Sequence, residues 1–287
     1  MNVLTETKVI TTTIELQQLT TKLKNNQKTI GFVPTMGYLH EGHRALLKEA
    51  RENNDIVVLS IFVNPLQFGP SEDLDSYPRD FKHDKQVAVE ENVDYIFHPS
   101  AEEMYPKELS VTVNVQKRTD ILCGKSRPGH FDGVATVLTK LFHLVQPNQV
   151  YFGQKDAQQV AVVDGLINDF HFPLQLVSVP TVREEDGLAK SSRNVRLSEQ
   201  ERMEAGILYR SLAKAREELI KGKTDINQLR NKLVADIEQE SSGKVDYLEV
   251  LTYPHLEQPT HLSGRLIVAL AVQFSQARLI DNIIFDL

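Results

Sequence analysis

The chain has 287 residues, of which 41% are hydrophobic and 25% charged, the balance of a globular protein able to bury a substantial core. Its formal net charge of −7 argues against a protein that binds nucleic acid through a basic face. The single cysteine, Cys123, permits no internal disulfide and favours a reducing compartment. The longest apolar run, residues 56–63, is far shorter than the ~20 residues of a membrane helix, and the first residues lack the apolar stretch of a signal peptide. We therefore expect a cytoplasmic protein.

Short β-branched apolar runs alternate with longer amphipathic stretches through the first 180 residues. This pattern predicts strands at 29–33, 56–63, 93–97, 149–153 and 174–180, with helices at 42–53, 81–91, 133–145 and 157–170. Residues 110–115 alternate between polar and apolar, which is typical of an edge strand. The strand–helix repeat predicts an α/β fold with a Rossmann-like, doubly wound parallel sheet. Such sheets bind their ligands beyond the carboxyl ends of the strands.

The pattern changes after residue 181. Two long charged helices are predicted at 199–221 and 226–240, and Ser198 with Glu201 forms a capping box at the start of the first. Two strands follow, at 244–251 and 265–274. We expect two domains, a Rossmann-like domain over 1–181 and a smaller α+β domain over 182–287.

The stretch VPTMGYLHEGHRALL at 33–47 places two histidines between a predicted strand and a predicted helix. The unpaired N–H groups at a helix start attract anions, and Gly37 and Gly42 let a phosphate approach the backbone. His40 and His43 would add donors that stabilise a departing pyrophosphate. A lone histidine here is more often a surface loop residue, but two in an H-x-G-H pattern favour a functional site. A zinc site is the weaker alternative, because only Glu41 lies nearby as a third ligand.

A second polar segment, GLAKSSRN at 187–194, carries two hydroxyls and two cations in four residues, Lys190 to Arg193. Such a loop suits the β- and γ-phosphates of ATP, and Gly187 is a candidate hinge for its closure. Taken alone, the segment fits an exposed polar linker equally well.

Together, the H-x-G-H pattern and the later K-S-S-R loop resemble the nucleotidyltransferase superfamily that includes class I aminoacyl-tRNA synthetases. Six further strings resemble the pantothenate synthetase family (pantoate–β-alanine ligases): FVPTMGYLHEGH, SIFVNPLQFGPSEDLDSYPRD, SRPGHFDGVATVLTKLFHLVQP, YFGQKDAQQ, GLAKSSRN and ARLIDN. This resemblance covers nearly the whole chain. It implies condensation of pantoate with β-alanine by way of a pantoyl-adenylate, using ATP and Mg²⁺ and releasing AMP and pyrophosphate. It also implies a cytoplasmic homodimer.

The resemblance assigns roles to particular positions. His43, His40 and Lys155 would be catalytic, Gln67 and Gln159 would bind pantoate, and Gln67 would also lie near β-alanine. ATP would be bound by Met36, Gly37, Tyr38, Leu39, His40, Glu41, Gly42, His43, Gly153, Gln154, Lys155, Asp156, Val182, Lys190, Ser191, Ser192 and Arg193. The chain departs from the family at Lys190, usually hydrophobic, and at Gln154, commonly glutamate.

The residue types suit this chemistry. Glutamine amides both donate and accept, as the hydroxyls and carboxylate of pantoate require, and a lysine can balance charge on the reacting α-phosphate. Each of these side chains has an ordinary alternative as a solvated surface residue. Arg127 and His130 would line the nucleotide pocket or form a plain Pro-Gly turn.

The metal ligands are not assigned by the sequence. Asp80, Asp84 and Asp156 are the carboxylates considered for Mg²⁺, which phosphates and water usually hold. No serine triad is indicated, and nothing marks Cys123 as an activated thiol.

Three other functions fit parts of the pattern. A related nucleotidyltransferase would share the histidines and differ in its acceptor pocket. A P-loop NTPase is suggested by CGKS at 123–126 and is rejected, because Thr119 stands where the motif needs glycine. An RNA-binding protein derived from the synthetase fold conflicts with the acidic charge balance.

Overall fold

The computed structural model describes all residues except 1–5, 71, 73 and 223–224. The chain forms two compact units, each assembled from separate stretches of sequence. Unit 1 contains residues 1–116, 127–153 and 162–179, and unit 2 contains residues 117–126, 154–161 and 180–287. The predicted domain boundary at 181/182 stays a prediction, and two short stretches before it, 117–126 and 154–161, lie in the compact unit 2.

Unit 1 is built on a parallel sheet, as predicted. The sheet has six strands, and the one at Lys8–Ile10 was not among the predicted strands. The strand order is β1-β4-β3-β2-β5-β6, with bounds β1 Lys8–Ile10, β2 Ile30–Thr35, β3 Ile56–Ile61, β4 Tyr95–Phe97, β5 Gln149–Gly153 and β6 Gln175–Val179. From β2, the chain adds β3 and β4 on one side of the sheet and then β5 and β6 on the other. The direction in which strands are added therefore reverses between β2 and β5. This reversal is where open α/β sheets form their ligand crevice.

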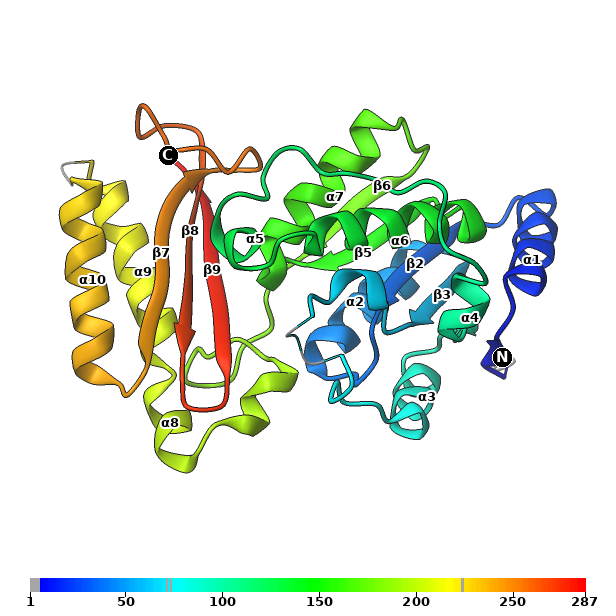
Figure 1. Cartoon of the computed structure of the whole chain (residues 1–287), viewed down its shortest axis with the longest axis horizontal. Helices are drawn as coiled ribbons and strands as arrows, with labels where there is room; N and C mark the ends of the chain where they lie inside the picture. Colours follow the sequence, from blue (N-terminus) through cyan, green and yellow to red (C-terminus); the bar gives the residue numbers. More distant parts are fainter. Residues whose placement is uncertain (1–5, 71, 73, 223–224) are drawn as a thin grey trace. The chain divides into compact units, whose positions relative to one another are not determined.

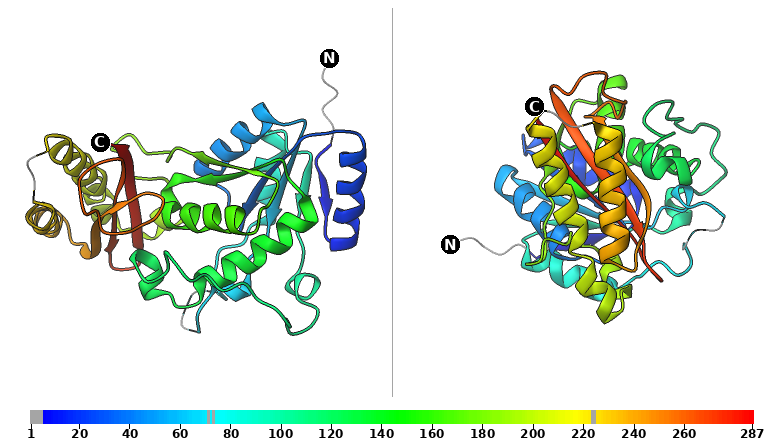
Figure 2. Two further views of the ribbon diagram at one scale, coloured as in Figure 1. Left: turned by 90° about the horizontal axis from the view of Figure 1, so that it is seen from above. Right: turned by 90° about the vertical axis from the view of Figure 1, so that its left-hand side faces the viewer.

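Helices cover both faces of this sheet, with α2 on one side and α6 on the other (Figure 2). The helices of unit 1 are α1 Thr13–Asn25, α2 Glu41–Asn53, α3 Phe81–Glu90, α4 Ala101–Met104 and α6 His130–Val145, with a short 3₁₀ turn, η1, at Pro65–Gln67. α7, Ala157–Asp169, begins in unit 2 and continues into unit 1. Covering both faces buries Val57, Val58 and Leu59 almost completely, which explains the unbroken apolar run of β3.

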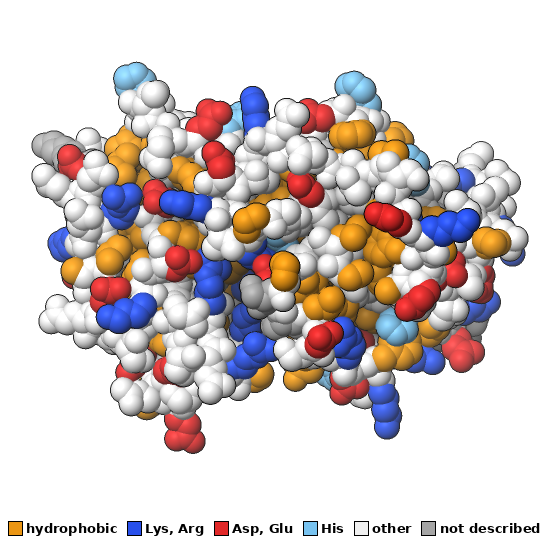
Figure 3. Space-filling view, in the orientation of Figure 1, with side chains coloured by type: hydrophobic (Ala, Val, Ile, Leu, Met, Phe, Trp, Pro, Cys, Tyr) orange, Lys and Arg blue, Asp and Glu red, His pale blue; other side chains and the backbone are white. Residues whose placement is uncertain are grey.

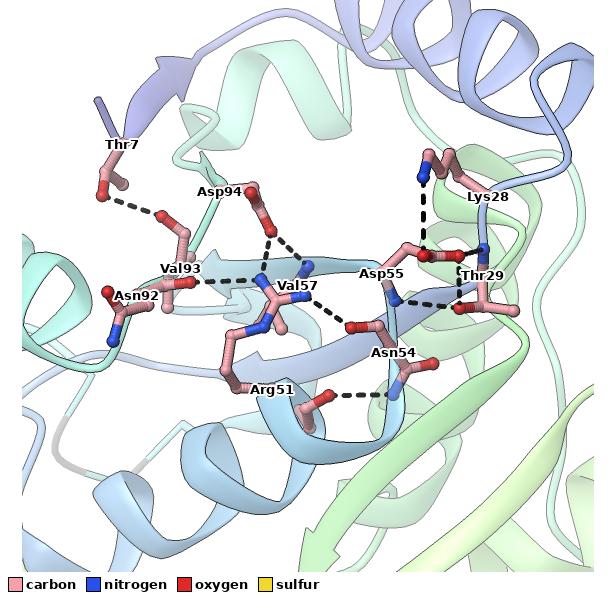
Figure 4. A network of polar contacts seen from close by, with 11 residues as sticks. Thr7, Lys28, Thr29, Arg51, Asn54, Asp55, Val57, Asn92, Val93 and Asp94 are labelled. Carbon is pink, nitrogen blue, oxygen red and sulfur yellow. Dashed lines mark hydrogen bonds and ion pairs between the residues drawn. The ribbon is translucent and has the colours of Figure 1, made fainter. Parts of the chain in front are cut away.

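A polar network braces the amino ends of β2, β3 and β4, the edge of the sheet opposite the expected ligand site (Figure 4). Asp94 Oδ2 accepts from Val57 N and from Arg51 Nη1, both at 2.7 Å. Asp55 Oδ2 accepts from Thr29 N at 2.9 Å, and the Thr29 donors lower the pKa of that carboxyl. These side chains satisfy strand ends and have a structural role.

The predicted edge strand at 110–115 is wrong, because this stretch has no strand structure. Its backbone amides bond to side chains of α6 in place of a neighbouring strand. Val113 N donates to Thr136 Oγ1 at 3.0 Å, and Val115 N donates to Asp132 Oδ1 at 2.7 Å. The alternating pattern therefore reflects packing along a helix.

Unit 2 contains a three-stranded antiparallel sheet, β7 Lys244–Thr252, β8 Arg265–Gln273 and β9 Arg278–Asp286, in that order (Figure 1). On one face lie α9, Ile207–Ile220, and α10, Ile226–Glu240, whose leucines pack with Leu248, Val268 and Leu279. On the other face, Ile267 and Ala269 pack with Leu122 of α5, Leu122–Ser126, and with Ala157 and Ala161 of α7. The predicted smaller α+β region is thus observed, and its third strand, β9, was not predicted.

The predicted continuous helix at 199–221 is wrong, because the segment breaks into α8, Glu199–Glu204, and α9. Gly206 lies at the break. Glycine is the least favourable residue after proline inside a helix, and a Cβ at this position would lie 3.3 Å from the carbonyl oxygen of Asp186. The predicted capping box of Ser198 and Glu201 is present.

Among the described residues, none of the helices combines the length and apolar character that crossing a membrane requires. On the face drawn in Figure 3, acidic, basic and hydrophobic side chains are mixed.

Candidate active site

Two histidines form a capping box at the start of α2, directly after the carboxyl end of β2. His40 is the N-cap residue, and its Nδ1 accepts from Gly42 N at 3.1 Å. His43 Nδ1 accepts in turn from His40 N at 3.2 Å. The two rings lie 4.2 Å apart, centroid to centroid. The H-x-G-H motif therefore caps the start of α2. Its two imidazoles take the places that serine and glutamate usually occupy in a capping box.

These contacts determine which ring nitrogen carries the proton. A neutral imidazole has one N–H and one acceptor nitrogen. Because both Nδ1 atoms accept backbone N–H groups, the neutral rings carry their protons on Nε2. In the neutral form of His40 and His43, Nε2 is therefore the donor atom while Nδ1 caps the helix.

Gly42 makes room for this arrangement. A Cβ at residue 42 would lie 2.8 Å from Cε1 of His40 and 3.0 Å from its Nδ1. Any side chain there would displace the capping ring.

The loop before the histidines is held by Asp84 of α3, a fully buried side chain. Asp84 Oδ2 accepts from Tyr38 N at 2.9 Å, and Oδ1 accepts from Leu39 N at 2.7 Å. Tyr38 has a φ of 53° and Gly37 a φ of 86°, so the loop passes twice through the left-handed region. Neighbouring His83 contacts the carbonyl of Leu39 through Nε2 at 3.1 Å. α3 therefore fixes the path of the predicted ATP loop.

This contact bears on the carboxylates considered for Mg²⁺. Both oxygens of Asp84 accept loop N–H groups, and Asp80 caps α3 by accepting from His83 N at 3.0 Å. Asp156 lies 3.5 Å from Lys155 Nζ. The part of the chain that the structure describes holds no cluster of three potential metal-binding side chains. Asp84 and Asp80 therefore already bond to backbone N–H groups in this part of the chain.

Gln67 lies in η1 beyond the end of β3 and is buried. Its Nε2 donates to Met36 Sδ at 3.0 Å, so the structure brings this predicted pantoate residue against the predicted ATP loop. Asn64 Nδ2 donates to Gln67 Oε1 at 3.2 Å. These two contacts use half of the four hydrogen bonds that an amide can make.

Asn64 is a supporting residue that the sequence analysis missed. It is only 1% exposed, and its Oδ1 accepts from Tyr105 Oη at 2.8 Å. Burial raises the pKa of Tyr105, so its hydroxyl stays a donor. The signal was available, because Asn64 stands beside Pro65 in the string NPLQF.

Arg127 and His130 also act on the Gln67 turn. His130 Nδ1 lies 2.8 Å from the carbonyl oxygen of Gln67, and its Nε2 lies 3.0 Å from Arg127 Nη1. The guanidinium of Arg127 grips Glu72 with two hydrogen bonds of 2.9 and 2.5 Å, and this contact lowers the pKa of Glu72. The Pro-Gly segment is therefore part of the architecture around Gln67.

The predicted residues of unit 2 begin with η2, Gln154–Asp156, at the start of α7. Lys155 is half-buried, with its Nζ 3.5 Å from Asp156 Oδ1. The two glutamines that follow differ. Gln158 is buried and bonds to the backbone of Gly124, Arg118 and Ile121, whereas Gln159, the predicted pantoate residue, is partly exposed. Of the two glutamines, only Gln159 is accessible to solvent, and its role in binding pantoate stays a prediction.

Residues 182–190 form a small hairpin, closed by hydrogen bonds from Lys190 N to Val182 O at 2.9 Å and from Glu184 N to Leu188 O at 2.8 Å. Gly187 sits at its turn with a φ of 91°, and a Cβ there would lie 2.4 Å from Cδ1 of Tyr209. Glycine is therefore required here for packing, and the hinge role of Gly187 stays a prediction. Lys190, which stands where the family usually has a hydrophobic residue, forms an ion pair with Glu184. Its Nζ lies 2.7 Å from Glu184 Oε2, so the carboxylate neutralises the additional positive charge.

The next residues form a 3₁₀ turn, η3 Ser192–Arg196. Ser191 caps it by accepting from Arg193 N at 3.2 Å. Asn194 Nδ2 donates to Ala189 O at 3.0 Å, which ties the turn to the hairpin. The K-S-S-R segment is thus a structured extension of the hairpin.

The P-loop alternative fails in the structure as well. CGKS lies within helix α5, and a Cβ on Gly124 would approach Thr119 O to 2.2 Å. A P-loop needs an open glycine-rich turn ahead of its helix.

The fold and these features define a class, the α/β enzymes that bind a ligand where parallel strands end beside a capped helix. The family model for pantoate-beta-alanine ligase matches residues 8–284. Pantothenate synthetase of Bacillus pumilus is 60% identical over 277 residues, covering 96% of each chain. That of Geobacillus sp. is 59% identical, covering 97% of this chain and 99% of the relative.

Solved structures agree. Pantothenate synthetase from Thermus thermophilus matches with a TM-score of 0.89 and 44% identity, covering 96% of this chain and 98% of that one. A pantoate-beta-alanine ligase from Francisella tularensis, complexed with beta-gamma ATP and beta-alanine, matches with a TM-score of 0.80 and 34% identity, covering 96% and 97%. The chain therefore belongs to the pantoate–β-alanine ligase family.

Proposed function

We propose that this chain condenses pantoate with β-alanine in two steps. A carboxylate oxygen of pantoate attacks the α-phosphorus of ATP, the bond to the β-phosphate breaks, and pyrophosphate leaves. The neutral amine of β-alanine then attacks the acyl carbon of the pantoyl-adenylate and loses a proton, and the acyl–oxygen bond breaks to release AMP. Family membership and the relative that binds ATP and β-alanine support this reaction.

The observation that carries the proposal is the histidine capping box. His40 and His43 present Nε2–H donors at the end of β2, beside a helix N-terminus that itself favours anions. In this role they stabilise charge on the departing pyrophosphate. Donors fixed before the reaction are effective because they need no reorganisation as charge develops.

We assign the other site residues by the same logic. Gln67, held by Asn64 and touching Met36, binds pantoate together with Gln159. Lys155 balances charge on the α-phosphate. Residues 36–43, 153–156, Val182 and 190–193 bind ATP.

Three further features belong to this proposal. Mg²⁺ accompanies the polyphosphate and neutralises part of its charge, and phosphate and water oxygens hold it. The family resemblance supports a homodimer. The resemblance and the single cysteine support a cytoplasmic location.

Pantoate-dependent exchange of labelled pyrophosphate into ATP tests the first step. We expect His43→Ala to lower the exchange rate by about 10²–10³-fold, the usual effect of losing one such donor. His143→Ala, which removes an exposed histidine from α6, is the matched control and should exchange normally. Near-normal exchange in His43→Ala would refute the role of His43. Exchange that depends on nicotinate mononucleotide or pantetheine phosphate in place of pantoate would assign the chain a different acceptor.

A further inference from the structure

The string ARLIDN at 277–282 resembles the family, yet none of the roles above uses it. Asp281 and Asn282 lie in β9, opposite Leu270 and Ala269 of β8, and only 2% and 6% of their surfaces are exposed. Consecutive residues of a strand point to opposite faces of its sheet. The two polar side chains are therefore buried on the two sides of the unit 2 sheet.

On the side of α9, Asp281 holds Arg183. Arg183 Nη1 donates to Oδ2 at 2.6 Å and Nη2 to Oδ1 at 3.0 Å, a bidentate geometry that fixes the guanidinium plane. Burial raises the pKa of Asp281, and the arginine opposes that shift. The guanidinium also lies 4.0 Å from the Tyr209 ring centroid and donates to Gly187 O at 3.0 Å.

Arg183 is part of the hairpin that leads into residues 190–193. It forms a bridge with Ala189, and Ala189 O accepts from Asn194 of η3. Asp281 thus fixes, through Arg183, both the turn of the hairpin at Gly187 and the strand that emerges toward the K-S-S-R segment.

On the opposite side, Asn282 holds the backbone of η2. Its Nδ2 donates to the carbonyl oxygens of Gln154 and Lys155, each at 2.9 Å. Asp281 also lies close enough to Lys155 for their charges to interact. Adjacent residues of one strand therefore hold two segments that lie far apart in the sequence.

We propose that Asp281 and Asn282 are positioning residues that set the placement of Lys155 and of the 190–193 segment against each other for binding ATP. The inference rests on the proposed function, which assigns both segments to ATP. Neither residue needs to touch the nucleotide.

The test is pantoate-dependent ATP–pyrophosphate exchange, measured against ATP and against pantoate. We expect Asn282→Ala to raise the KM for ATP about tenfold to a hundredfold, as misplacement of binding groups by ~1 Å does, with the KM for pantoate within about twofold of wild type. Asn282→Ser keeps one donor and should give an intermediate value. Asp281→Asn loses the arginine fork and should raise the KM for ATP in the same way.

Asp286→Asn is the matched control. Asp286 lies in the same strand and grips Arg265 through two bonds of 3.0 and 3.2 Å, but its side chain is 67% exposed. Its exchange should equal that of wild type.

The outcomes separate the possibilities. A purely structural role lowers kcat in proportion to the folded fraction, measured by far-UV circular dichroism, and leaves both KM values unchanged. That result, an equal rise in the KM for pantoate, or failure of both Asn282 variants to fold would overturn the proposal. No exchange in wild type and Asp286→Asn would instead remove the proposed function, and the positioning role with it.

Discussion

Asp84→Ala removes the side chain that holds the loop ahead of the histidines. The carboxylate accepts two backbone N–H groups, at 2.9 and 2.7 Å, and hydrogen bonds to a charged group contribute about 1.5–3 kcal/mol each. Leu39 is only 3% exposed, so its N–H would be left without water. We therefore expect the free energy of unfolding to fall by at least about 3 kcal/mol, the lower value for each of two bonds.

The same change should lower activity beyond its effect on stability. Tyr38 has a φ of 53°, a conformation that persists only while its surroundings enforce it. Once the loop relaxes, His40 and His43 lose their placement, and pantoate-dependent exchange falls even at temperatures where the variant is fully folded. Urea unfolding measures the first effect, and exchange assayed about 15 °C below the midpoint of thermal unfolding measures the second.

Asp80→Asn is the control for Asp84, because Asp80 caps the same helix and asparagine caps as well as aspartate. Its stability should stay within about 0.5 kcal/mol of wild type. The reasoning fails if Asp84→Ala matches that control in both measurements.

Three further predictions concern other parts of the chain. Gly42→Ala should displace the His40 ring, which a Cβ would approach to 2.8 Å, and lower exchange about tenfold or more; unchanged exchange would contradict the capping geometry. Backbone N–H groups of Ser198 and Ser275 lower the pKa of Glu201 to about 2, below its value of about 4.3 in an unfolded chain. Ionised Glu201 therefore stabilises the folded protein above pH ~4, and this contribution is lost as the pH falls toward ~2. Glu201→Gln should flatten that part of the stability–pH curve, and an unchanged curve would refute it. Lys190→Met removes a half-buried ion pair with Glu184 and should change stability by less than about 1 kcal/mol; a larger loss on urea unfolding would show that the pair holds the hairpin.

The parallel sheet could be predicted because its strands are short, β-branched and separated by amphipathic helices. β9 was missed because Asp281 and Asn282 interrupt its apolar pattern, and their burial depends on Arg183 and on the backbone at 154–155, far away in the sequence. For residues 110–115 the error was the reverse, because a strand was predicted where the structure has none. Their alternation is real, but helix side chains, not a strand, satisfy their amides.

The histidine motif and Gln67 were found from their positions after strands. Their supports were not, since Asp84 lies 45 residues beyond Leu39 and nothing local marks it as the acceptor for that loop. The use of Nδ1 for capping depends on side-chain rotamers, which sequence spacing does not determine. The separation of Gln158 from Gln159 likewise follows from which face of α7 is buried.

The fate of the carboxylate oxygens of pantoate tests the central claim most directly. Pantoate labelled with ¹⁸O in its carboxylate is incubated with the protein, ATP, Mg²⁺ and β-alanine, and the products are analysed by mass spectrometry. Attack on the α-phosphorus predicts one labelled oxygen in each AMP formed and none in pyrophosphate. AMP without label, or label in pyrophosphate or inorganic phosphate, would contradict a pantoyl-adenylate.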